Sequence, residues 1–163
     1  ITEGGHNGFE AGIDALLRVV DAVRDAAPDA PILVRFSAAD WADGGWDVEQ
    51  TSVVAGWAAD HGADFFDISS GGLVAHQRIA VGPGYQVPLA AHVRSAAAVA
   101  VGAVGLITDA AQAEAILQAG DADVILAGRE WLRDPHFALR ASIELGADID
   151  YWPKQYLRAR PRR

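Results

Sequence analysis

Arginine and glycine residues at the ends of apolar segments are the residues of this sequence that could act on a ligand. Arg35 lies in the apolar segment Ile32–Ala38, and Gly105 and Gly128 lie near the ends of two further apolar segments, with Arg129 directly after Gly128. Glycines at strand ends let backbone N–H groups approach an anion, and an arginine adds a charged donor. The pattern predicts a site for a phosphate-bearing ligand, although strand-end glycines also serve packing alone.

Arg35 permits two interpretations, and they are compatible with each other. Side chains alternate along a strand, so Ile32, Val34 and Phe36 share an apolar face while Arg35 lies on the polar face. One interpretation is a structural ion pair with Asp67 on the next strand. The other is a fixed cation directed at a ligand that becomes anionic, at the mouth of a barrel.

The sequence gives little support for a metal site or for a catalytic nucleophile. Cysteine is absent, which excludes disulfides, thiolate metal ligands and a cysteine nucleophile. No metal-binding or catalytic-triad motif includes the histidines, which are His6, His61, His76, His92 and His136. We expect no metal, and His76 fits a solvated loop residue better than a ligand contact. The run Ser69–Gly72 fits a tight turn and an anion-binding nest equally well.

The elements that position these residues alternate between strands and helices. Apolar, β-favouring segments predict strands at Ile32–Ala38, Ala63–Ser70, Val99–Ile107 and Ala122–Gly128. Helical spacing predicts helices at Phe9–Ala27, Val48–His61, Pro88–Ala97, Ala110–Gly120 and Arg129–Gly146. Alternation of this kind requires right-handed crossovers and a parallel sheet, hence an α/β fold.

The spacing of the four strands distinguishes two α/β architectures. The strands begin roughly 25 to 35 residues apart, which over eight units gives about the 250 residues typical of a (β/α)8 TIM barrel. We therefore expect residues 1–150 to form half of such a barrel, with four parallel strands and their helices. A complete small domain with a doubly wound sheet is the alternative.

Charge is distributed unevenly, and this bears on partners and location. The chain has a net charge of −9, yet residues 151–163 form a basic tail with one lysine and four arginines and no acidic residue. An acidic body disfavours nucleic acid, and apolar runs are too short to span a membrane. We expect a cytoplasmic protein without nucleic-acid or membrane partners. The first residue is Ile1, so we do not expect a natural start there.

A series of segments resembles the thermophilic-like subgroup of the Old Yellow Enzyme family over residues 16–160. These segments are VRFSAADW, GADFFDISSGG, PGYQVPLA, GAVGLIT, QAEAILQAGDADVILAGREWLRDPHFALRA and WPKQYLR. The resemblance implies the C-terminal half of a (β/α)8 barrel that binds FMN. It also implies an ene-reductase or NAD(P)H dehydrogenase that reduces activated C=C bonds of small molecules by hydride transfer through flavin N5.

The resemblance also assigns roles to single residues. Arg35 matches the arginine beside flavin N1, where a cation stabilises the anionic reduced flavin, and Ser69 matches a flavin-contacting serine. Gly105, Gly128 and Arg129 match the residues that hold the FMN phosphate. A fifth match, Arg158, implies a contact in the active site of a neighbouring subunit.

Part of the family's machinery has no counterpart in this chain. The first four βα units are absent, and with them the tyrosine proton donor, so the isolated chain is expected to be inactive. Open strand edges predict association with the missing N-terminal half, a second copy or another chain. The alternative is a non-catalytic half-barrel that binds a phosphate-bearing ligand or a partner protein.

Overall fold

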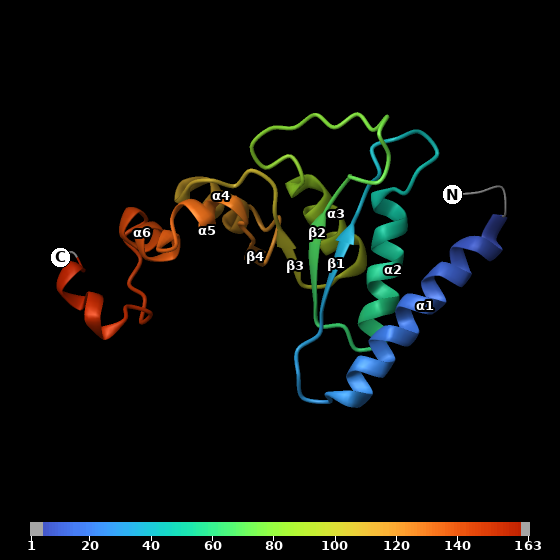
Figure 1. Cartoon of the computed structure of the whole chain (residues 1–163), viewed down its shortest axis with the longest axis horizontal. Coiled ribbons are helices and arrows are strands. Elements are labelled where there is room, and N and C mark those ends of the chain that lie inside the picture. Colours follow the sequence, from blue (N-terminus) through green and yellow to red (C-terminus); the bar gives the residue numbers. More distant parts are fainter. Residues whose placement is uncertain (1–4, 161–163) are drawn as a thin grey trace.

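The computed structural model describes residues 5–160, with side chains from residue 12 onward. The elements run in the order α1 (Gly5–Ala26), β1 (Leu33–Ser37), α2 (Val48–Asp60), β2 (Phe65–Ser69), α3 (Val87–Ala97), β3 (Val101–Ala103), α4 (Ala110–Ala119), β4 (Val124–Ile125), α5 (Arg129–Arg133), α6 (Phe137–Glu144) and the 3-10 helix η1 (Lys154–Ala159) (Figure 1). The expected alternation of strands and helices is confirmed.

The four strands form one parallel sheet in the order β1-β2-β3-β4. Arg35 lies opposite Asp67, and Asp67 lies opposite Gly102, so these three residues share one face of the sheet. Strands that follow one another in the chain are neighbours in the sheet and are joined by helices, which is the connectivity of a (β/α)8 barrel. The expected α/β fold with four parallel strands, arranged as part of a barrel, is confirmed.

Several element ends differ from the expected ones for local backbone reasons. The third strand ends at Ala103 instead of Ile107, because Gly105 (φ 120°) and Leu106 (φ 51°) leave the extended conformation. The predicted helical stretch Arg129–Gly146, expected in two pieces with a proline near the start of the second, forms α5 and α6, which are separated at Asp134, whose extended backbone precedes Pro135. A residue before proline is disfavoured in the helical region.

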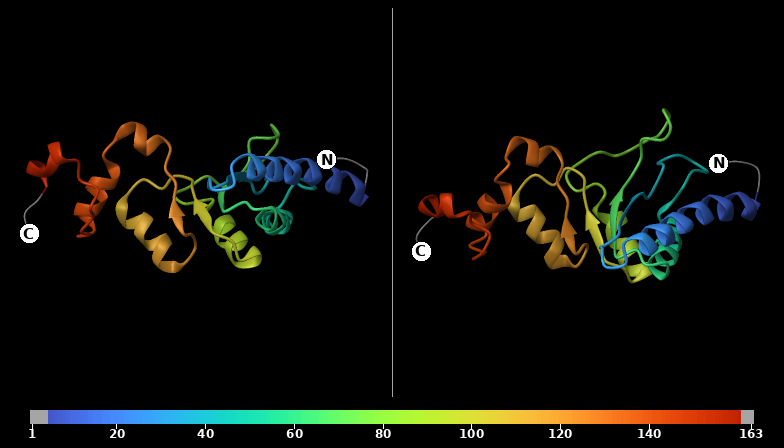
Figure 2. Two further views of the ribbon diagram at one scale, coloured as in Figure 1. Left: turned by 90° about the horizontal axis from the view of Figure 1, so that it is seen from below. Right: turned by 60° about the horizontal axis from the view of Figure 1, so that its bottom comes forward.

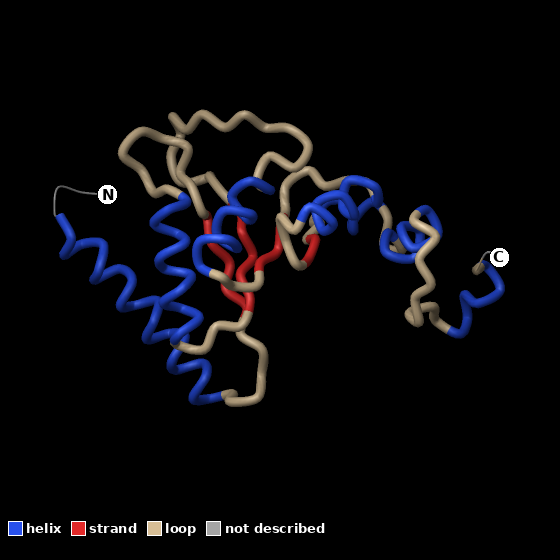
Figure 3. Tube along the Cα trace, turned by 180° about the vertical axis from the view of Figure 1, so that it is seen from behind, coloured by secondary structure: helices blue, strands red, loops and turns tan. Residues whose placement is uncertain are grey.

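The apolar core lies between one face of the sheet and the helices. Phe66, Ile68 and Val101 are fully buried there, and Val93 of α3 and Val54 of α2 pack from the helix side. Figure 2 shows α2, α3 and α4 following one another along this side of the sheet, and Figure 3 shows the sheet (red) and the helices (blue) from behind. The face that packs on the helices is therefore the apolar face expected from the alternation.

The opposite face of the sheet, called the inner face below, is partly uncovered. Leu33 of β1 is 62% exposed and Val124 of β4 is 43% exposed. In the middle of the sheet Phe65 and Leu126 close over Gly102, where an added Cβ would lie 2.7 to 2.8 Å from their side chains. Both side chains belong to the edge strands, so the uncovered part of the inner face lies towards the two edges of the sheet.

An aspartate ties β1 to β2 at the N-terminal ends of these strands. Asp64, just before β2, accepts the backbone N–H of Ile32 (2.8 Å) and a guanidinium N–H of Arg24 (2.6 Å). Arg24 lies in α1 and also donates to three carbonyl oxygens of the connecting loops. These bonds hold the pKa of Asp64 below its usual range, first through the Ile32 N–H and then through Arg24.

The same arrangement recurs between β3 and β4. Asp123, just before β4, accepts the backbone N–H of Val101 (2.9 Å) and is bound by Arg94 of α3 through contacts of 2.9 to 3.1 Å. Arg94 is the largest cause of the lowered pKa of Asp123. A helix arginine and an aspartate before a strand thus join the strands in two successive pairs.

Candidate functional site

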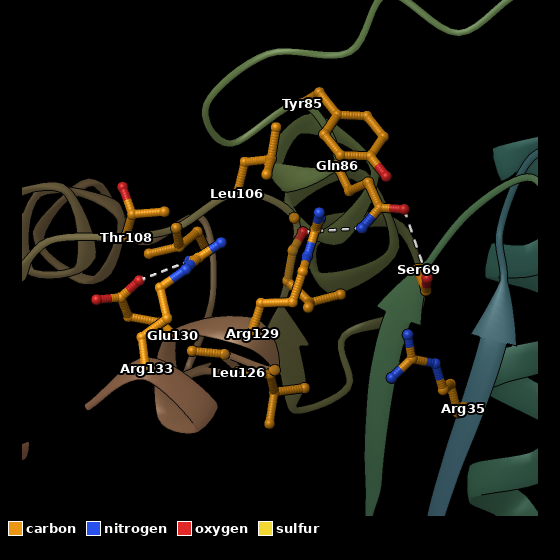
Figure 4. A pocket seen from close by; sticks show the side chains of 15 residues that line it. Arg35, Ser69, Tyr85, Gln86, Leu106, Thr108, Leu126, Arg129, Glu130 and Arg133 are labelled. Atoms are coloured by element: carbon orange, nitrogen blue, oxygen red, sulfur yellow. Dashed lines mark hydrogen bonds and ion pairs between the residues drawn. The ribbon is translucent and has the colours of Figure 1, made fainter. Parts of the chain in front are cut away.

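A pocket of about 270 Å³ opens at the C-terminal ends of the strands (Figure 4). It is lined by Arg35 of β1, Ser69 of β2, residues 104–108 after β3, residues 126–130 around the start of α5, and Tyr85, Gln86 and Arg133. Active sites of (β/α)8 barrels lie at this end of the strands. The structure therefore brings Arg35, Ser69, Gly105, Gly128 and Arg129 to one pocket.

Backbone N–H groups on two sides of the pocket have no acceptor. Among residues 5–160, none accepts a hydrogen bond from the backbone N–H of Gly105, Leu106, Gly128 or Arg129. Gly105 must be glycine, because its φ is 120° and an added Cβ would lie 2.8 Å from the Gln86 side chain. Free N–H groups at strand and helix ends favour an anion, because they supply donors that need an acceptor.

Arg129 contributes an uncompensated positive charge to the same pocket. Its side chain extends into the pocket, whereas Arg133 is paired with Glu130 at 3.0 Å (Figure 4). No carboxylate of the described residues forms an ion pair with Arg129. The charge of Arg129 therefore remains available to an anionic ligand.

Arg35 lies on the inner face and is held by a single ion pair. One guanidinium nitrogen donates to Oδ2 of Asp67 at 2.8 Å, which is the structural pair expected from the sequence. The Arg35 side chain is still 59% exposed, so its remaining N–H groups face the open side of the sheet. Asp67 is mostly covered, and its second oxygen is buried with no partner among the described residues.

Arg158 and His76 lie away from this pocket, whereas the run Ser69–Gly72 begins at its lining residue Ser69. Arg158 is exposed on η1, at the far end of the molecule from β1 and β2 (Figure 1). His76 is exposed in the loop that follows β2. The N–H groups of Gly71 and Gly72 already donate to Ala39 and Gln77, so they are not available to an anion, and residues 70–72 are irregular backbone after β2. Arg162 and Arg163 of the basic tail lie outside the described residues.

Sequence reasoning missed Gln86, which lies at the base of the pocket. Its side chain is 3% exposed and links residues at the ends of β2 and β3. The available signal was a glutamine at the residue before Val87 and Pro88, where a helix begins and Ser, Thr, Asp or Asn is the common cap. Nothing in the periodicity of the segment distinguishes this glutamine from a solvent-exposed one.

Residues 5–160 contain no group of three His, Asp or Glu side chains placed to hold a metal ion. None of the helices in this part of the chain combines the length and the apolar character needed to span a membrane.

Comparison with protein families decides the identity of the chain. The model of the NADH:flavin oxidoreductase / NADH oxidase family matches residues 10–147. The chain belongs to this family. The expected relationship to Old Yellow Enzyme proteins is thereby confirmed, and the family is one of oxidoreductases that use a flavin and a nicotinamide cofactor.

Curated relatives of this chain are considerably longer. NADPH dehydrogenase from Bacillus subtilis is 47% identical over 143 residues, which are 88% of this chain and 41% of the relative. NADPH dehydrogenase from Listeria monocytogenes is 47% identical over 141 residues, 86% of this chain and 41% of the relative. The chain therefore spans about two fifths of the length of these relatives.

Solved structures support the fold of this family member. A 2-naphthoyl-CoA reductase complexed with 2-naphthoyl-CoA gives a TM-score of 0.71 at 20% identity, over 83% of this chain and 21% of that chain. The aldolase QR15 gives a TM-score of 0.55 at 20% identity, over 83% of this chain and 56% of that chain. These matches to parts of TIM-barrel-like chains agree with half of a barrel.

Proposed function

We propose that this chain supplies the FMN-binding part of an NAD(P)H-dependent ene-reductase. The pocket at the strand ends carries the proposal, because it joins free backbone N–H groups at Gly105 and Gly128 to the unpaired charge of Arg129. A phosphate dianion matches this donor set in charge and in number of acceptor oxygens. Membership of a flavin-using family supports FMN as the source of this phosphate.

The remaining pocket residues fit the other parts of FMN. Ser69 lies at the end of β2, between the phosphate donors and Arg35. Arg35 would hold a cation at the flavin edge that becomes negative on reduction, with Asp67 fixing its position. When bound, FMN supplies hydride transfer through N5 from NAD(P)H to an activated C=C bond.

The proposed partner is the part of the family fold that this chain does not contain. In a (β/α)8 barrel each of eight strands is followed by one helix position. This chain has four strands but carries helices beyond both edge strands, with α1 before β1 and α5–α6 after β4. In a barrel built from two copies, α1 of one copy and α5–α6 of the other would compete for the same position.

A partner with four strands and only three intervening helices closes the barrel without this competition. The relatives are long enough to contain such a part, since the matched region is only 41% of their length. Contact between two complete barrels is a separate kind of association. We propose that Arg158 takes part in it by entering the active site of a neighbouring barrel, because η1 lies far from the pocket of its own chain.

The test of this function is FMN binding by the chain and by Arg129→Ala. We expect the variant to lose roughly 1.5 to 3 kcal/mol of FMN binding free energy, the value of a charge-assisted hydrogen bond. Riboflavin, which lacks the phosphate, should bind both proteins equally. Arg18→Ala, at an exposed arginine of α1, serves as the matched control. Equal FMN affinity of Arg129→Ala and the unaltered chain would reject the phosphate site.

A further inference from the structure

Gln86 is a buried polar residue that the proposed FMN contacts do not use. It occupies the residue before α3, yet its side chain makes no capping hydrogen bond to that helix. Only 3% of its surface is exposed, and a buried amide must find partners for both its oxygen and its nitrogen. Those partners lie on two different strand ends.

The hydrogen bonds of Gln86 connect the ends of β2 and β3. Nε2 donates to the carbonyl oxygen of Val104 at 3.0 Å. Oε1 accepts from the hydroxyl of Ser70 at 2.7 Å and, more weakly, from that of Ser69 at 3.4 Å. A carbonyl oxygen can only accept, so the amide orientation is fixed and the serine hydroxyls must donate to Oε1.

The segment that carries Gln86 is also tied to the phosphate side of the pocket. The backbone N–H of Gly84 donates to the carbonyl oxygen of Gly105 at 2.9 Å. Together with the bond to Val104, this contact holds the turn at Gly105 against residues 84–86. The same amide therefore contacts Ser69 on one side of the pocket and, on the other, the Val104 carbonyl of the peptide unit that also carries the Gly105 N–H.

We propose that Gln86 is a positioning residue that sets the separation between the Ser69 side and the Gly105 side of the pocket. This inference rests on the proposed function, because only a ligand that spans both sides depends on their separation. FMN has its phosphate at one end and its ring system at the other. Inorganic phosphate and riboflavin each engage a single side and are insensitive to the spacing.

The test uses Gln86→Met, which keeps the side-chain length but loses all three hydrogen bonds. FMN affinity is measured by fluorescence quenching, and binding of inorganic phosphate and riboflavin by amide chemical-shift titration. We expect FMN to bind roughly tenfold more weakly. Affinities for phosphate alone and riboflavin alone should stay within about twofold of those of the unaltered chain. Gln118→Met is the control, since Gln118 is exposed and bonds only to Glu114.

A second variant protects the test against misfolding of the first. Ser70→Ala removes the shorter of the two hydrogen bonds to Oε1 on the β2 side and leaves both the Ser69 contact and the bond from Gln86 to Val104 in place. We expect a smaller loss of FMN affinity, about threefold, again without loss of phosphate affinity. Unchanged FMN affinity in folded Gln86→Met or in Ser70→Ala overturns the positioning role. Failure of the unaltered chain to bind FMN overturns the proposed function itself.

Discussion

Gly105 is the residue at which the backbone of the pocket tolerates least change. Its φ of 120° is rarely adopted by residues with a side chain, and an added Cβ would meet Gln86 at 2.8 Å and Tyr85 at 3.1 Å. We expect Gly105→Ala to lower the free energy of unfolding by roughly 1 to 3 kcal/mol and to weaken FMN binding. Chemical denaturation measures the first effect.

Gly128→Ala is the matched control for that substitution. Gly128 has a negative φ, and a Cβ added there meets no atom within 4 Å. The free energy of unfolding should therefore change by less than about 0.5 kcal/mol. Equal losses of unfolding free energy in Gly105→Ala and Gly128→Ala would show that the positive φ of Gly105 adds no strain to the alanine variant.

Arg35 is where a planar guanidinium matters most. We expect Arg35→Lys to preserve folding, because the side chain is 59% exposed. Flavin reduction in a barrel completed by the missing part should slow roughly 10- to 100-fold, since lysine lacks the second directed N–H of the guanidinium. Stopped-flow absorbance measures the rate, and reduction at the original rate would show that Arg35 does not serve the flavin.

Single residues were predictable from sequence when their role followed from strand position. The pairing of Arg35 with Asp67 and the convergence of Gly105, Gly128 and Arg129 on one pocket both follow from parallel strands that end at the same edge. Gln86 was not predictable in this way. Its partners come from loops whose path depends on tertiary contacts that no local spacing encodes.

The ion pair between Asp123, just before β4, and Arg94 of α3 gives a prediction about stability at acid pH. The pKa of Asp123 is lowered in the folded protein, chiefly by Arg94, so its contribution is fully present above the unfolded pKa of about 4. That contribution is lost as the pH falls through the lower, folded-state value. We expect Asp123→Asn to cost about 1 kcal/mol at pH 7, a modest figure because the side chain is 33% exposed.

The pH dependence separates this effect from a general loss of packing. As the pH falls through the folded-state pKa of Asp123, the variant and the unaltered chain should converge in unfolding free energy, because Asp123 then becomes protonated in both states of the unaltered chain. Urea denaturation from pH 2.5 to pH 7 measures the difference. A constant gap across this range would mean that the ion pair with Arg94 contributes nothing.

Element boundaries were predictable where side chains determine them. Asp47 and Asp109 accept hydrogen bonds from the first turns of α2 and α4, and both helices begin where the sequence indicates. Strands β3 and β4 are much shorter than their apolar segments. Apolar character reports burial, whereas strand length depends on neighbouring strands, and β4 has none on its outer side.

The uncovered inner face gives a prediction for the whole molecule. We expect the chain to form a one-to-one complex with the unmatched part of Bacillus subtilis NADPH dehydrogenase. Leu33→Glu should prevent the complex, because Leu33 is 62% exposed on the inner face and a charge would be buried there. Size-exclusion chromatography with light scattering measures the stoichiometry.

Leu73→Glu is the control for this experiment, since Leu73 is equally accessible (66% exposed) but lies in the loop after β2. Neither substitution should change the unfolding free energy of the isolated chain by more than about 0.5 kcal/mol. A complex that survives Leu33→Glu would place the partner elsewhere than on the inner face.

The ties between strands alternate between the two ends of the sheet. Asp64 and Asp123 join β1 to β2 and β3 to β4 at the N-terminal end, whereas Gln86 joins β2 to β3 at the C-terminal end. Separation of the strands at either end of the sheet would break at least one of these hydrogen-bond contacts. These contacts thus hold neighbouring strands together at both ends of the sheet, so that the rest of a barrel would meet strands that are already fixed relative to one another.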